Sequence, residues 1–182
     1  MTEVALDSGW PKIWAIEAGG CLLGSFEGFS PSLAPVVRGE RIWRDQVVGR
    51  LTIAGLGTPA HVKSTVGSAS VSQTFGLVEV GLKLRPARPV RLFLSLGAGV
   101  LHVTSEGRGT AFPYQALSGS EWTPVADAGA GLRVALRGRF ELAAEVHAQV
   151  AQRYPEIHFV DGTVARTGRP TVIGSLTLVA WL

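Results

Sequence analysis

The stretch that decides the fold is residues 126–150, ADAGAGLRVALRGRFELAAEVHAQV. Its even positions are almost all aliphatic or aromatic, whereas most of its odd positions are charged, polar or glycine. Alternation of this length is typical of β-strands, because successive side chains of a strand point to opposite faces. The Arg-Gly-Arg sequence at 137–139 splits the stretch into two strands joined by a tight turn.

The same alternation continues through the rest of the chain. Apolar residues occupy the even positions of three further stretches, and three less regular strands are expected nearer the N-terminus, the first with Glu17 opposite its apolar face. The pattern predicts roughly eight strands in all. The stretches outside 126–150 are 14–22, 32–40, 47–56, 76–84, 90–100 and 172–182.

The connections between these strands alternate in length, which is typical of bacterial outer-membrane barrels. We therefore predict an all-β protein, an antiparallel up-and-down transmembrane β-barrel with short periplasmic turns and longer extracellular loops. The tight or short connections are 40–46, 85–89 and 137–139, and the connections on the other side are 25–31, 57–72, 105–121 and 152–169.

The composition excludes several functional classes. Only 17 % of the residues are charged, and the basic residues are scattered rather than interleaved with aromatics, so no nucleic-acid partner is expected. Cys21 is the single cysteine, which excludes an internal disulfide and a cysteine-based zinc site. No cofactor and no metal is expected. No stretch is apolar enough for a membrane helix.

Alternation alone leaves two kinds of barrel open. A soluble lipocalin-like barrel would bury the apolar face and bind a ligand, whereas a membrane barrel turns that face toward lipid. The mixed face carries glycine pairs such as Gly97/Gly99 and Gly129/Gly131. Small residues suit the narrow interior of an eight-stranded barrel, where they leave room for long charged side chains.

The charges of the mixed face also favour an interior position. A buried unpaired charge costs several kcal/mol, so a polar lumen must be nearly neutral. We predict an ion-pair cluster that plugs the lumen, with Arg133 bonded to at least one of Glu141 and Glu145 on the next strand. The members of this cluster are Glu17, Arg38, Arg50, Glu79, Lys83, Asp127, Arg133, Glu141 and Glu145. The acids of this face are Glu17, Glu40, Glu79, Asp127, Glu141 and Glu145, and the bases are Arg38, Arg50, Lys83, Arg85, Arg91 and Arg133.

Aromatic residues occur on the apolar face near both ends of the predicted strands. Trp14 and Phe140 lie near the short turns, and Trp122 and Tyr154 lie where strands meet long loops. Amphipathic rings are expected at both membrane interfaces. These four residues are the predicted aromatic girdle.

The segments Leu-Gly-Ala-Gly-Val (96–100) and Ala-Gly-Ala-Gly-Leu (128–132), together with a last strand of alternating apolar residues, allow a resemblance to be stated. The chain resembles the small outer-membrane barrels of the OmpA/OmpX type. The resemblance implies insertion into the outer membrane of a Gram-negative envelope, with variable surface loops. The aromatic residue that usually ends such a barrel is replaced by Leu182, with Trp181 one place earlier.

The beginning of the chain lacks a signal-peptide pattern, an observation that supports the soluble alternative. We expect residues 1–182 to form one barrel domain and residues 1–11 to be a periplasmic extension.

Few residues suggest chemistry. His102 and Thr104 lie at even positions, on the apolar face near the outer rim. They leave open the alternative of a lipid-modifying enzyme that would act as a lipid hydrolase at the rim. His147 is expected in the lumen network, and His61 and His158 in loops match no known metal-ligand spacing. The leading prediction is a non-enzymatic barrel of the bacterial outer membrane with a structural or interaction role. Its partners would be the lipid bilayer and another envelope protein.

Overall fold

The computed structural model describes residues 13–25, 30–44, 46–63, 67–84, 89–109, 118–152, 156–158, 164–166 and 170–182. The predicted extension 1–11 lies outside these ranges, as do Arg85 and Tyr154. The strands are β1 (Trp14–Ser25), β2 (Ser32–Arg44), β3 (Val47–Ala54), β4 (Ala60–Lys63), β5 (Gly67–Leu84), β6 (Val90–Gly109), β7 (Ser118–Ala135), β8 (Phe140–Ala151), β9 (Glu156–His158), β10 (Val164–Arg166) and β11 (Thr171–Trp181).

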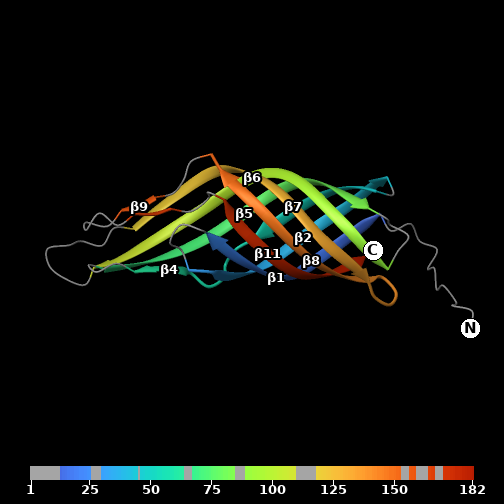
Figure 1. The fold of residues 1–182 in the computed structure, drawn as a ribbon, viewed down its shortest axis with the longest axis horizontal. Helices are drawn as coiled ribbons and strands as arrows, with labels where there is room; N and C mark the ends of the chain where they lie inside the picture. The colour runs from blue at the N-terminus through green and yellow to red at the C-terminus, as the bar shows by residue number, and fades with distance from the viewer. Residues whose placement is uncertain are drawn as a thin grey trace, which may run out of the picture.

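Eight of these strands close into a barrel. The order around the barrel is β3-β2-β1-β11-β8-β7-β6-β5, and antiparallel pairing of β3 with β5 completes the ring. The strands slant around one long axis (Figure 1). The predicted all-β, antiparallel barrel of eight strands is therefore confirmed. Within the described ranges no helix is long and apolar enough to cross a membrane.

The apolar face of the strands points outward around the whole barrel. Leu96 of β6 is 69 % exposed, whereas its neighbour Ser95 is buried inside. On β8 the exposed and buried positions alternate without a break. The soluble lipocalin-like alternative is wrong, because such a barrel would bury the aliphatic side chains and expose the charges.

The long connections are shorter than the sequence pattern suggested. The predicted link 57–72 contains β4 and the first residues of β5, and β4 pairs with β5 from Ala60↔Val71 to Lys63↔Ser68. β6 continues to Gly109, and β7 begins at Ser118. β9 and β10 form a separate two-stranded sheet inside the link 152–169. The error arose because these segments are rich in Ser, Gly and Thr, which is typical of loops but is also tolerated in strands outside the apolar band.

The lumen has two layers, of which the sequence pattern identified only one. Toward the long-connection end, the inward side chains are apolar and packed together, and they include Leu23, Phe75 and Leu101. These residues have the same parity as the charges farther down the same strands. Where the inward side chains are apolar, the strands no longer alternate between a charged face and an apolar face. The sequence pattern therefore did not reveal this layer.

Candidate functional site

The site that the fold builds is the charged layer of the lumen, and Arg133 lies at its centre. Its side chain is 0 % exposed, and its two terminal nitrogens bind both oxygens of Glu40, at 2.8 and 2.6 Å. Nη2 also lies 2.9 Å from Glu145 Oε1 and 3.2 Å from Glu17 Oε2. Four strands, β1, β2, β7 and β8, are thus tied together by one guanidinium group.

Arg50 of β3 forms a second centre. It binds Glu79 through Nε at 3.0 Å and through Nη2 at 2.6 Å, in the bidentate geometry that makes such pairs strong. Its Nη1 lies 2.7 Å from Glu145 Oε2. Glu79 also accepts a hydrogen bond from Thr52. Glu145 therefore connects the two arginine centres.

Glu17 is satisfied from a third side. Arg38 of β2 donates to Glu17 Oε1, and Thr177 of β11 donates to the same oxygen at 2.6 Å. Arg38 Nη2 lies 3.1 Å from the hydroxyl of Ser175. The Glu17 carboxylate is thus neutralised by nearby guanidinium groups and further bonded by a hydroxyl, which offsets the cost of burying its charge.

Phe93 is a functional residue of this layer that the sequence analysis missed. Its ring contacts two cations, with the guanidinium carbons of Arg133 at 4.2 Å and of Arg50 at 4.7 Å from its centroid. A side chain at Gly81 would collide with this ring, since a Cβ there would lie 2.3 Å from Phe93 Cζ. The sequence did offer a signal, because Phe93 is an aromatic residue at an odd position, on the face that carries the lumen charges, and a glycine lies near it on the neighbouring strand.

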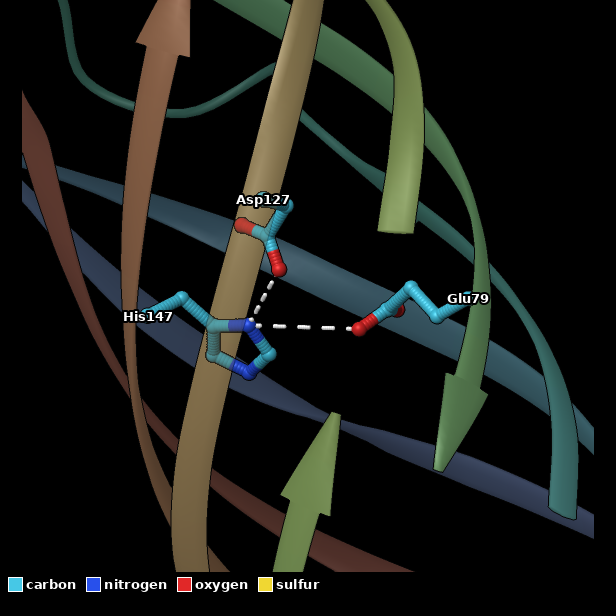
Figure 2. Close-up of side chains that lie close together, drawn as sticks. All are labelled: Glu79, Asp127 and His147. Atoms are coloured by element: carbon cyan, nitrogen blue, oxygen red, sulfur yellow. Dashed lines mark hydrogen bonds and ion pairs between the residues drawn. The ribbon is translucent and has the colours of Figure 1, made fainter. Parts of the chain in front are cut away.

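His147 contacts two carboxylates at once, and Figure 2 shows the contact with Asp127. Its Nδ1 lies 2.8 Å from Asp127 Oδ2, and its Nε2 lies 3.1 Å from Glu145 Oε2. Ionised carboxylates only accept hydrogen bonds, so both contacts are satisfied when both ring nitrogens carry a proton. Gly129 leaves the space for this ring, since a Cβ there would lie 2.5 Å from Nδ1.

The charges of the described part of the lumen balance when His147 is an imidazolium. Six carboxylates then face six cations. The carboxylates are Glu17, Glu40, Glu79, Asp127, Glu141 and Glu145, and the cations are Arg38, Arg50, Lys83, Arg91, Arg133 and His147.

Glu79, Asp127 and His147 could also hold a metal ion, since one ligand atom of each lies within 4.8 Å of the others. Glu79 Oε1 is 3.9 Å from His147 Nδ1 (Figure 2). Arg50, however, already binds both oxygens of Glu79. A metal ion here would have to displace or face a guanidinium group.

Two further cations lie at the short-turn end of the layer. Arg91 pairs with Glu141 at 2.6 Å, while Arg133 pairs with Glu145, one of the two acids named for it in the sequence analysis. Lys83 Nζ lies 3.9 Å from the centroid of the Trp181 ring and 3.8 Å from Glu40 Oε2. Trp181, the aromatic residue one place before Leu182, is therefore an inward, buried residue at this end of the lumen.

The predicted girdle residues within the described ranges all point outward. Trp14 and Phe140 lie near the short turns, and Trp122 lies near the opposite end; Tyr154 is outside the described residues. Trp43 is an exposed member of the short-turn end that the prediction missed. The Arg41 guanidinium lies 5.0 Å from the centroid of the Trp14 ring.

The rim histidine pairs with a different hydroxyl from the one the sequence suggested. His102 Nε2 lies 2.7 Å from Ser120 Oγ on the adjacent strand, and its ring stacks on Trp122 with 4.2 Å between centroids. Thr104 is not its partner. Among the described residues no carboxylate is hydrogen-bonded to His102, so the third member of a Ser-His-acid triad is missing from this part of the chain. His61 contacts Ser70 at 3.3 Å, and the side chain of His158 is outside the described set.

Comparisons with known proteins agree with this architecture. No protein-family model matches the chain, and no curated protein matches it. Among solved structures, the fold is similar to that of Neisserial surface protein A, with a TM-score of 0.64 at 11 % identity over 94 % of this chain and 98 % of that one. A major outer membrane protein from Thermus thermophilus has a TM-score of 0.61 at 11 % identity, covering 92 % of this chain and 99 % of that one.

The N-terminal barrel domain of Pseudomonas aeruginosa OprF is a third example, with a TM-score of 0.53 at 13 % identity over 91 % of this chain and 96 % of that one. At identities this low, the structural similarity establishes a shared fold and nothing more. The chain therefore has the fold of the small eight-stranded outer-membrane β-barrels, and the aliphatic outer face of that barrel is the surface that a membrane requires.

Proposed function

We propose that the protein is a non-enzymatic barrel of the bacterial outer membrane with a structural or interaction role in the envelope, and that its lumen is sealed. The observation that carries this proposal is the position of Arg133, fully buried and shared by Glu17, Glu40 and Glu145. A side chain held by carboxylates of three other strands cannot swing aside without leaving several charges unpaired.

The apolar layer supports the same proposal. Above the ion pairs, buried residues such as Leu101, Val103 and Val125 fill the barrel. An ion that crosses the lumen would have to leave water for this apolar layer, which is strongly unfavourable. Two layers of opposite chemistry therefore oppose permeation. An interaction role is consistent with this seal, because a sealed barrel offers partners only its ends and its outer face.

The proposal also covers residues 1–11. β1 begins at Trp14, beside the short turns, so residues 1–11 would extend from the periplasmic end of a single barrel domain.

The experiment that tests the proposal combines location and conductance. The full chain should stay with the outer-membrane fraction after a carbonate wash and should migrate faster on a gel when it is not boiled. In planar bilayers it should show little stable conductance. Recovery as a soluble monomer without detergent would contradict the location, whereas a large steady pore would contradict the sealed lumen.

A further inference from the structure

The outer surface of β5, β6 and β7 changes character at one level of the barrel. Below this level, the outward positions that lie side by side are apolar, as in Val78, Ala98 and Ala126 or Gly76, Val100 and Pro124. The next row up is Thr74, His102 and Trp122. The apolar rows from Leu84 to Gly76 span about 20 Å along the barrel axis, for a rise of ~3.3 Å per residue and a tilt near 40°, which is close to the ~25 Å apolar band of a membrane barrel.

Two more polar rows follow above Thr74. Nine outward residues thus form what we call the hydroxyl face. Its members, row by row, are Thr74, His102 and Trp122, then Ser72, Thr104 and Ser120, then Ser70, Glu106 and Ser118. Behind this face, Val71, Leu101 and Val103 of the same strands are buried. The face is therefore the outside of a continuous wall, directly above the lipid-facing band.

The chemistry of the hydroxyl face is uncharged and hydrogen-bonding. Six of its nine residues carry hydroxyls, each of which can both donate and accept. None of the nine is Lys or Arg, and the one formal charge is the negative charge of Glu106. Such a surface lacks the cationic donors that form the strongest hydrogen bonds to phosphate.

The opposite end of the barrel differs in this respect. Its outward aromatic residues Trp14 and Trp43 lie near the exposed Arg41, and the exposed Arg137 and Arg139 lie in the β7–β8 turn. The aromatic residue of the hydroxyl face, Trp122, has only hydroxyl and imidazole neighbours in its row and the next. The outward surfaces at the two ends of the barrel thus differ in their charge.

Trp122 has the geometry of a binding platform. It is 66 % exposed, although the ring of His102 stacks on it. The hydrogen bond between His102 and Ser120 holds that imidazole in place. A rigid, exposed indole bordered by hydroxyls offers an apolar surface for the C–H groups of a sugar ring and polar partners for its hydroxyls.

We propose that the hydroxyl face binds the saccharide headgroup of a glycolipid in the outer leaflet. The position of the face sets this choice, because it continues the lipid-facing band and meets the headgroup layer of the same membrane. The inference rests on the proposed membrane location and names the partner of the outer face. It is independent of the sealed lumen, since none of the nine residues lies inside the barrel.

The test uses the full chain in detergent, titrated with digalactosyldiacylglycerol, phosphatidylcholine or phosphatidylglycerol, with bound lipid counted by native mass spectrometry. Digalactosyldiacylglycerol carries a saccharide but no phosphate. The wild type should retain it several-fold better than phosphatidylcholine. Trp122→Ala should remove this preference, and Ser120→Ala should reduce it. The matched control Trp43→Ala, at the other end, should leave the preference unchanged.

Three results would overturn the proposal. The first is equal retention of digalactosyldiacylglycerol and phosphatidylcholine by the wild type. The second is a preference that survives Trp122→Ala in protein that still shows the gel shift of a folded barrel. The third is a Trp122-dependent preference for phosphatidylglycerol over digalactosyldiacylglycerol, which would assign the face to a charged headgroup. The carbonate-wash and conductance experiments would be unaffected by any of these results.

Discussion

Arg133 Nη2 and Glu145 Oε1 lie 2.9 Å apart across neighbouring strands β7 and β8, both withdrawn from solvent. Arg133 is paired with Ala143 in the strand register and Glu145 with Gly131, so the ion pair crosses diagonally between two small residues. Glu145 is one of three carboxylates that contact the same guanidinium, so the removal of the Arg133 side chain should lower the free energy of unfolding more than the removal of any other side chain of the cluster.

Arg133→Ala should lower the free energy of unfolding by about 3–5 kcal/mol, because it leaves buried carboxylates without their cation. Urea titration of the folded barrel in detergent measures this change. Arg137→Ala, in the exposed β7–β8 turn, is the matched control and should be nearly neutral. A neutral Arg133→Ala would mean that the residue faces water.

The wild-type barrel should show little stable conductance in planar bilayers, and Arg133→Ala should not by itself open a pore. The reason is that the apolar layer around Phe75 and Leu101 remains closed above the altered ion pairs. Single-channel recording of both proteins checks this expectation. If only the variant forms steady channels, the charged layer alone blocks the passage of ions in the wild type.

Leu96→Arg should cost about 2–4 kcal/mol, because Leu96 lies midway along the apolar band of β6 and would place a charge near the bilayer midplane. Val134→Arg should cost only about 0–1 kcal/mol, since Val134 pairs with Val90 in the row nearest the short turns. Urea titration in lipid vesicles compares the two. Equal costs would show that the band is placed wrongly along the barrel.

Zinc at millimolar concentration should leave the urea midpoint of the wild type unchanged. A ligand that binds only the folded state raises stability with its concentration, but at Glu79 the ion would compete with the bidentate contact from Arg50. A rise in midpoint that disappears in His147→Gln would establish a metal site at Glu79, Asp127 and His147.

A fluorophosphonate probe should not label Ser120. His102 can accept the proton of this hydroxyl, but no carboxylate among the described residues orients the imidazole for catalysis. Mass spectrometry of the treated protein, beside a serine hydrolase as positive control, reads out the modification. Labelling of Ser120 that is lost in His102→Ala would favour the lipid hydrolase.

Much of the architecture could be read from the sequence, because the two-residue period assigns each side chain to a face independently of its partners. The alternation in 126–150 placed Arg133, Glu141 and Glu145 on one face and Leu132 and Val134 on the other. In the barrel, the first three side chains point inward and the other two point outward. The narrow interior of eight strands then required that the charged face hold small residues and near-equal charge.

Only the tertiary structure decided which of these side chains meet. Glu17, Glu40 and Glu145 come from three different strands, and their convergence on Arg133 depends on barrel closure and register, which no local pattern encodes. Likewise, His102 meets Ser120 rather than the nearby Thr104, because strand pairing brings β6 and β7 side by side. Sequence determines the face of a residue through local geometry, whereas contacts across the lumen are set by the closed ring of strands.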